Sequence, residues 1–127
     1  MQNFDIIFYQ TDEGICPVAN YLKSIQDKKL YAKILRDINL LKVSGNLLHE
    51  PYSKSLSHGL FELRTKQGSN ISRIIYFFII GNRIILTNGF IKKTSKTPKE
   101  ELNKALKYKN DYLNRFSSKE GFNYGKI

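Results

Sequence analysis

Three short polar groups, each at the end of an apolar run, are the part of this chain best suited to chemistry. They are Glu62-Leu63-Arg64, Ser72-Arg73 and residues 92–96, which read Lys-Lys-Thr-Ser-Lys. Guanidinium groups stay protonated and grip phosphate oxygens in a fork, and ammonium groups neutralise the same charge. If the three groups converge, the residue types predict a cationic cluster that binds a phosphate and stabilises charge developing on it.

The apolar runs that carry these groups read as three consecutive β-strands. We predict strands at residues 60–66, 71–80 and 83–92. Residues 67–70 form the first loop, and Gly81-Asn82 is a two-residue turn of the kind that tight hairpins favour. The middle strand is apolar on both sides, as expected of a central strand that is covered on both faces.

These turns fix a register between the strands. Arg64 is predicted to lie opposite Arg73, Arg73 opposite Phe90, and Ile71 opposite Lys92. Alternation then assigns one face to Glu62, Arg64, Lys66, Arg73, Phe90 and Lys92. The other face is predicted to bury the helices and carries Phe61, Leu63, Ile74, Tyr76, Phe78, Ile85 and Ile91. A bulge at Asn88-Gly89 would exchange Lys92 and Lys93, so both remain candidates.

Two arginines placed directly opposite each other destabilise a sheet unless something offsets the repulsion. A bound anion would do so, which is the physical argument for a phosphate site. The alternative is that Arg64 and Arg73 extend into solvent or pair with Glu62 and with acids of the last helix.

The rest of the chain predicts one strand and three helices around this sheet. Residues 4–9 read as an opening strand, Pro17 begins a short helix, and Asp27 caps a second helix that ends at Ser44-Gly45-Asn46. Residues 46–59 read as a loop. Thr97 and Glu100 form a capping box for a last helix. The predicted class is α+β in the order β-α-α-β-β-β-α, with one domain at residues 1–116 and a polar, flexible tail at residues 117–127.

The charge and composition of the chain indicate what kind of partner it binds and in which cellular compartment it is found. The formal net charge is +10; residues 1–50 hold 6 basic and 6 acidic residues, and residues 51–127 hold 15 and 5. This asymmetry indicates a polyanionic partner, with a lysine-rich solvated surface as the plainer alternative. Cys16 is the single cysteine, so a disulfide within the chain and a cysteine-based metal site are excluded. Without a signal sequence or a membrane-length apolar run, we expect a cytoplasmic protein. We expect neither a metal nor a cofactor.

Three motifs resemble the phage-derived Gp49-like/HigB branch of the RelE/ParE toxin superfamily. They are Gly-Leu-Phe-Glu-Leu-Arg at residues 59–64, Arg-Ile-Ile-Tyr at residues 73–76, and the block at residues 89–101 that contains Phe-Ile-Lys-Lys and Lys-Thr-Pro. The resemblance implies a RelE-like fold with a small, mostly antiparallel sheet. It implies the toxin of a type II toxin–antitoxin pair, a ribosome-dependent endoribonuclease that cuts translated mRNA. It also implies a cognate antitoxin, a helix-turn-helix protein similar to HigA, so that DNA is contacted only through the antitoxin. The family's basic site positions correspond here to Arg64, Arg73, Lys92, Lys93 and Lys96.

RNA can be cut without a metal when its 2′-OH attacks the adjacent phosphate and the 5′-oxygen leaves. Arg64 and Arg73 suit the charge-stabilising role, and Lys92, Lys93 or Lys96 can act as the base if neighbouring cations depress its pKa. Which residue is the base stays open.

Three further residues near the cluster have weaker claims to a role. Glu62 is more plausible as a salt-bridge partner than as a base, His58 as an incidental surface residue than as an acid, and Tyr76 as a core residue than as a catalytic one.

Binding of the ribosome or RNA is predicted for Lys66, Phe90, Lys99, Lys104 and Lys107, with a solubilising role as the alternative for each lysine of the last helix. Two other functions remain open at this point. One is a ParE-like inhibitor of DNA gyrase, and the other is a non-catalytic nucleic-acid-binding module.

Overall fold

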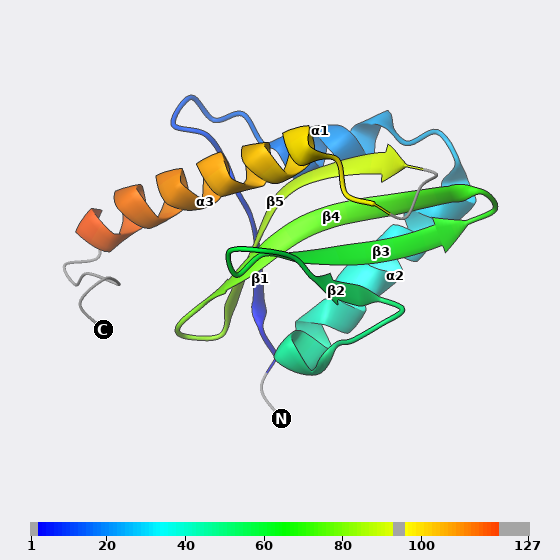
Figure 1. Cartoon of the computed structure of the whole chain (residues 1–127), viewed down its shortest axis with the longest axis horizontal. Coiled ribbons are helices and arrows are strands. Elements are labelled where there is room, and N and C mark those ends of the chain that lie inside the picture. The colour runs from blue at the N-terminus through cyan, green and yellow to red at the C-terminus, as the bar shows by residue number, and fades with distance from the viewer. Residues whose placement is uncertain (1–2, 93–95, 120–127) are drawn as a thin grey trace.

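A five-stranded sheet with helices on both of its faces forms the body of the protein, in a computed structural model that describes residues 3–92 and 96–119 (Figure 1). Strand β1 (Asp5–Phe8) is followed by helices α1 (Pro17–Ser24) and α2 (Lys28–Ser44) and a 3-10 turn (Gly45–Leu47). Strands β2 (Ser53–Ser55), β3 (Phe61–Gln67), β4 (Asn70–Ile79) and β5 (Arg83–Lys92) come next, and α3 (Lys99–Lys119) ends the described chain.

The α+β class is confirmed, but the predicted element order is wrong, because it lacks one strand. The segment predicted as a loop contains the short strand β2, which pairs antiparallel with β3. The strand order is β1-β5-β4-β3-β2, and β1 runs parallel to β5, so the sheet is mixed. The pairing of β1 with β5 depends on contact between distant segments, which local periodicity does not encode, and β2 has only 3 residues, too few for a clear alternating pattern.

The register across β3, β4 and β5 is the predicted one at the site end of the sheet. Arg64 pairs with Arg73, Arg73 with Phe90, and Ile71 with Lys92. The turn between β4 and β5 is nevertheless one residue longer than predicted, because Ile79 rather than Ile80 pairs with Arg83.

A β-bulge compensates for this longer turn. Ile75 pairs with Asn88 and Tyr76 with Leu86, so Thr87 is the extra residue in β5. From Asn88 onward the bulge restores the predicted pairing. In the part of β5 before the bulge, the side chains point to the opposite face from the predicted one. Ile85 therefore packs on the α3 side, against the prediction, and Ile84 and Leu86 take its place on the other side.

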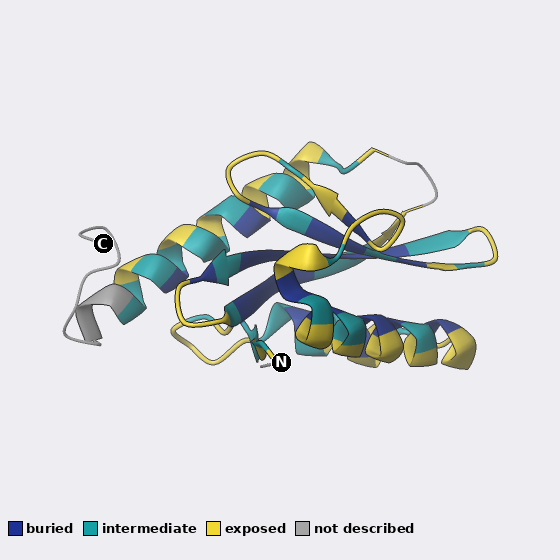
Figure 2. Ribbon diagram, turned by 90° about the horizontal axis from the view of Figure 1, so that it is seen from below, coloured by how far each residue is buried: buried dark blue, intermediate teal, exposed yellow. Residues whose placement is uncertain are grey.

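Two apolar clusters lie on the two faces of the sheet (Figure 2). One buries the inner sides of α1 and α2 against Leu63, Ile74 and Tyr76. The other buries α3, through Ala105 and Tyr112, against Ile75 and other β-strand residues. The sheet is thus covered on both sides, as the apolar middle strand predicted.

Helix starts follow the sequence in two cases and depart from it in one. Pro17 occupies the first turn of α1, and the Asp27 carboxylate accepts bonds from the backbone amides of Lys29 and Leu30 at 2.9 and 3.2 Å. Thr97 does not act as the predicted cap: α3 begins at Lys99, and the Thr97 hydroxyl donates to Glu62.

The last helix extends beyond the predicted domain boundary. It runs to Lys119, and the remainder of the predicted tail, residues 120–127, lies outside the described residues. None of the helices described is both long enough and apolar enough to cross a membrane.

Candidate functional site

A fully buried carboxylate, Glu62, is the centre of the polar cluster on the α3 side of the sheet. Its Oε1 accepts a hydrogen bond from Arg64 Nε at 2.8 Å, and its Oε2 accepts one from Thr97 Oγ1 at 2.6 Å. Arg73 Nη1 lies 4.0 Å from the same Oε1. A buried carboxylate is stable only when paired and hydrogen-bonded, and these contacts meet that need. Both carboxylate oxygens are thereby engaged, which favours a positioning role for Glu62 over that of a base.

Arg73 is the least accessible of the predicted cations. Its relative exposure is 0%. Burial lowers the pKa of its guanidinium and the neighbouring Arg64 lowers it further, whereas the charge of Glu62 opposes this effect. The alternative that the opposed arginines pair with Glu62 is therefore the one that the structure shows, because Glu62 supplies an anion from within the protein.

Arg64 reaches the surface of the cluster while remaining tied to its centre. Its side chain is 20% exposed, and its Nε is held by Glu62. Such a guanidinium is oriented from within the protein and still presents part of its surface to solvent. The structure thus places the two opposed arginines in different surroundings, one buried and one accessible.

Lysines form the rim of the cluster at the end of the sheet. Lys66 and Lys92 both pair with Ile71, one on each side of it, in the row next to Arg64 and Arg73. Both lysines are exposed, and so is Lys96, which precedes α3. Lys93 lies outside the described residues. We name Glu62, Arg64, Arg73, Lys66 and Lys92 the sheet-end cluster.

Phe90 completes the row that contains the two arginines. It pairs with Arg73, is half-buried, and packs against the apolar cluster on the α3 side. Its backbone carbonyl accepts a bond from the Tyr21 hydroxyl at 3.3 Å.

Of the three weaker acid–base candidates, Glu62 lies in the sheet-end cluster, whereas Tyr76 and His58 lie apart from it. Tyr76 is buried on the opposite face, where its hydroxyl is hydrogen-bonded to Ser53, so its prediction as a core residue is confirmed. His58 lies in the turn between β2 and β3, where its backbone carbonyl accepts a bond from Lys109 Nζ at 2.7 Å. This contact is with the middle of α3, whereas Thr97 and Lys96 precede that helix.

The three predicted ribosome-binding lysines of α3 are all exposed. Lys99 and Lys107 lie on its surface, and Lys104 Nζ is 3.4 Å from Glu101 Oε2. The other oxygen of Glu101 accepts a bond from Asn88 Nδ2 at 3.1 Å, which fastens the start of α3 to β5.

Tyr21 fastens α1 to the same end of the sheet from the opposite face. Its hydroxyl donates to Ser72 Oγ at 2.7 Å, and burial raises its pKa to about 12. The ring lies over Gly89, where an added Cβ would come within 2.4 Å of it. Sequence reasoning missed this contact; the glycine between Asn88 and Phe90 is the signal that could have revealed it.

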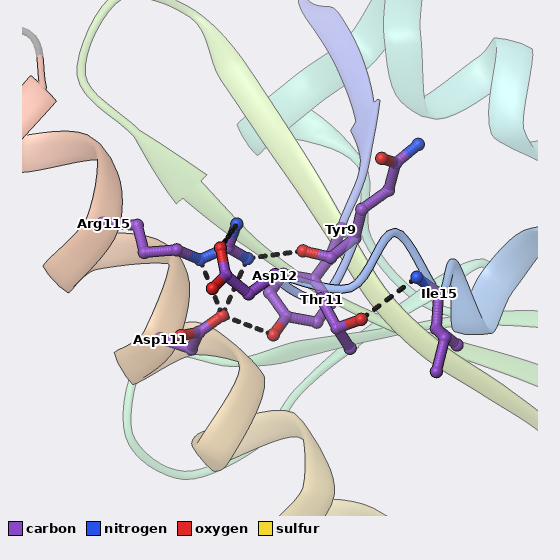
Figure 3. A network of polar contacts seen from close by, with 7 residues as sticks. Tyr9, Thr11, Asp12, Ile15, Asp111 and Arg115 are labelled. Carbon is purple, nitrogen blue, oxygen red and sulfur yellow. Dashed lines mark hydrogen bonds and ion pairs between the residues drawn. The ribbon is translucent and has the colours of Figure 1, made fainter.

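A second polar network ties the far part of α3 to the end of β1 (Figure 3). Asp111 Oδ2 accepts bonds from the Tyr9 hydroxyl at 2.6 Å and from Arg115 Nη2 at 2.7 Å. Arg115 Nη2 also donates to the backbone carbonyl of Gln10. A hollow of about 520 Å³ lies beside the network, lined by residues of the β1–α1 loop together with Tyr112, Arg115 and Phe116.

Metal ligands do not gather at either network. Within residues 3–92 and 96–119, no three His, Cys, Asp or Glu side chains form a group that could hold a metal ion.

The region that holds the sheet-end cluster matches a known protein family. A family model described as phage-derived protein Gp49-like (DUF891) matches residues 20–110. That span contains all of the predicted site residues and leaves out β1 and Arg115. A comparison with curated proteins finds no match.

Proposed function

Because this chain belongs to the phage-derived Gp49-like family, we propose that it is the toxin of a type II toxin–antitoxin pair that cuts mRNA on the ribosome. The match covers most of the chain, and the family is consistent with a toxin at that level. The observation that carries the finer proposal is the sheet-end cluster, where Arg64 and Arg73 flank a buried Glu62 inside a rim of lysines.

The cluster suits a phosphodiester because its charges are unequal and its geometry is fixed in advance. Two guanidinium groups accompany one carboxylate in the sheet-end cluster. Arg64, Arg73 and Glu62 therefore have a net positive charge, and Lys66 and Lys92 of the same cluster add to it. Arg64 is already oriented by Glu62, which lowers the entropy cost when its exposed part grips a phosphate. A group held in place in this way stabilises the charge of the transition state without having to reorganise.

The proposed reaction divides these roles among named residues. The RNA 2′-oxygen attacks the phosphorus, a proton leaves the 2′-OH, and the 5′-oxygen departs with a proton to give a 2′,3′-cyclic phosphate. Arg64 contacts the phosphate, while Arg73 and Glu62 are positioning residues beneath it. Lys92, Lys93 and Lys96 are the candidates for proton transfer, and the ribosome aligns the RNA.

The test removes single cations and measures cleavage of a reporter mRNA in a translation extract. Arg64→Ala and Lys92→Ala are expected to reduce the cleavage rate about 100-fold or more, as removal of one group that stabilises the transition state does. Lys42→Ala removes the same charge as Lys92→Ala but from the end of α2, where Lys42 is exposed, and should leave cleavage unchanged.

Each alternative function predicts a different result in these assays. Unchanged cleavage in both Arg64→Ala and Lys92→Ala would refute the assigned roles. Gyrase-dependent DNA damage without mRNA cleavage would indicate a ParE-like inhibitor. Binding of nucleic acid without cut transcripts would indicate a non-catalytic module.

A further inference from the structure

The side of α2 that faces away from the sheet is exposed (Figure 2), and it carries an apolar ridge. Tyr31, Leu35 and Val43 are 39%, 43% and 44% exposed. With Asn39 they follow one another at intervals of four residues. Such a row is the ridge that one helix inserts between the side chains of another. Leu47, which is 69% exposed, lies in the 3-10 turn that follows α2.

The charges beside this ridge have one sign. Lys28, Lys29 and Lys42 are exposed along α2, whereas the exposed Arg36 is paired through its Nε with Asp37 Oδ1 at 2.9 Å. The acid of this helix, Asp37, is only 1% exposed and bonds to Thr65 Oγ1 at 2.7 Å under the helix. The outward surface of Lys28–Ser44, a stretch described in full, is therefore apolar along its centre and basic beside it.

A hollow next to the ridge offers a place for an anchoring side chain. It has a volume of about 330 Å³ and is lined by Arg36, Asp37, Asn39, Leu40, Val43 and Tyr52. Interfaces draw much of their affinity from a bulky side chain that fills such a hollow.

We propose that this α2 ridge is the docking surface for an amphipathic helix of a protein partner, with apolar residues at intervals of four and carboxylates on both flanks. Apolar burial along the ridge supplies affinity, and the lysines select acidic flanks. A second copy of this chain fits poorly, because two α2 surfaces brought together would oppose lysine to lysine.

The identity of the partner as the neutralising protein rests on the proposed function; the surface itself does not. The ridge lies on the α2 side of the sheet, whereas the sheet-end cluster faces the α3 side. A helix bound to the ridge leaves the cluster uncovered. Neutralisation through this surface therefore acts by adding bulk that prevents entry into the ribosome, not by filling the phosphate site.

The test places a carboxylate on the ridge and measures binding of the protein encoded by the adjacent reading frame. Leu35→Asp and Val43→Asp are each expected to weaken binding about 10- to 100-fold by calorimetry. Ile80→Asp is the matched control, because Ile80 is 64% exposed in the β4–β5 turn; it should bind like the wild type. Thermal unfolding of all three variants checks that they fold.

The outcomes separate this inference from the proposed function. Wild-type affinity in both ridge variants would overturn the docking surface, as would a failure of the adjacent protein to bind the wild-type chain. A dimer of the isolated chain that Leu35→Asp dissociates, or a photocrosslink from position 35 to ribosomal RNA, would assign the ridge to another occupant. Cleavage of mRNA should be normal in the ridge variants. If the wild type binds its partner but cuts no mRNA, and Leu35→Asp still weakens that binding, the proposed toxin activity is refuted and the docking surface is supported.

Discussion

At the scale of single residues, the sheet-end cluster is built around Glu62, a carboxylate that is fully buried. Glu62 joins Arg64 of its own strand to Thr97 of the segment that leads into α3. The segment that carries Lys96 is therefore tied to the strand that carries Arg64 through one hydrogen bond to a buried charge. Loss of that bond should destabilise the fold, because it would leave a buried carboxylate oxygen without a donor.

Replacing Thr97 with Val tests this tie. The variant keeps the shape of the side chain and removes the donor to Glu62 Oε2, so unfolding should require about 1–3 kcal/mol less free energy. Thr97→Ser retains a hydroxyl and should restore most of that stability. Urea titration measures both variants, and an unchanged slope with denaturant shows that stability rather than compactness has changed. Equal stability of Thr97→Val and the wild type would mean that the bond contributes nothing.

At the scale of elements, α3 is held at both of its ends, and the two attachments differ chemically. Asn88 and Glu101 fix its start through an amide and a carboxylate. Its far part is fixed to the end of β1 by Asp111, whose pKa is lowered first by the Tyr9 hydroxyl and then by Arg115. Protonation of Asp111 would remove the charge on which the far attachment depends, so acid should weaken this attachment.

Stability should fall in acid partly because Asp111 is protonated. Its folded-state pKa lies below the ordinary value of 3.8, so the ionised form is favoured by folding. That contribution is complete above this value and disappears as the pH falls through the folded-state pKa. Asp111→Asn should flatten the dependence of unfolding free energy on pH below about 4. Asp12→Asn is the control, because Asp12 is 90% exposed and 3.9 Å from Arg115. A wild-type acid profile in Asp111→Asn would contradict the assignment.

The β4–β5 hairpin shows how far sequence reasoning reached at this scale. The pairing of Arg64, Arg73 and Phe90 was predictable, although the turn was assigned one residue too short. The extra turn residue shifts the register by one, and the bulge at Thr87 shifts it back from Asn88 onward. Phe90 and Lys92 were therefore placed correctly, whereas Ile85, which precedes the bulge, was not. A bulge is selected by cross-strand packing and has no strong local signature, so periodicity could not locate it.

The tie between Glu62 and Thr97 escaped prediction for a related reason. Thr97 precedes Pro98 and has Glu100 three residues on, which is a good local pattern for a cap. The tertiary alternative, a buried carboxylate in need of a donor, depends on burial that the sequence does not show. The residue types at the site were readable from the chain, but the fully buried state of Arg73 and Glu62 was not.

At the scale of the whole molecule, the net charge of +10 lies entirely after residue 50 and surrounds both the sheet end and α3. If the protein associates with nucleic acid as proposed, the association releases counterions, so its affinity should depend strongly on salt. Lys99 and Lys107 should contribute more than Lys104, because Lys104 has Glu101 within 3.4 Å.

The salt dependence of ribosome association tests this view. Replacing Lys99 and Lys107 together with Ala should lower the slope of log affinity against log salt by about one for each phosphate that is no longer neutralised. Lys23 and Lys42 are both exposed on the helices of the other face, so the double Ala variant at these positions removes equal charge. It should keep the wild-type slope. Equal slopes in both double variants would mean that net charge alone, not its placement on α3, governs association.

The parallel pairing of β1 with β5 also determines when this protein can become complete. Its first strand forms hydrogen bonds with a strand whose residues begin at Arg83, and Tyr9 binds a carboxylate 102 residues further along the chain. Neither partner exists while the first half of the chain is being synthesised. The N-terminal strand therefore cannot pair before β5 has been synthesised, and Tyr9 cannot form its bond before Asp111 has been synthesised. The first strand of the chain is therefore added to the sheet only after the strands that follow it, because β5 is its neighbour in the sheet.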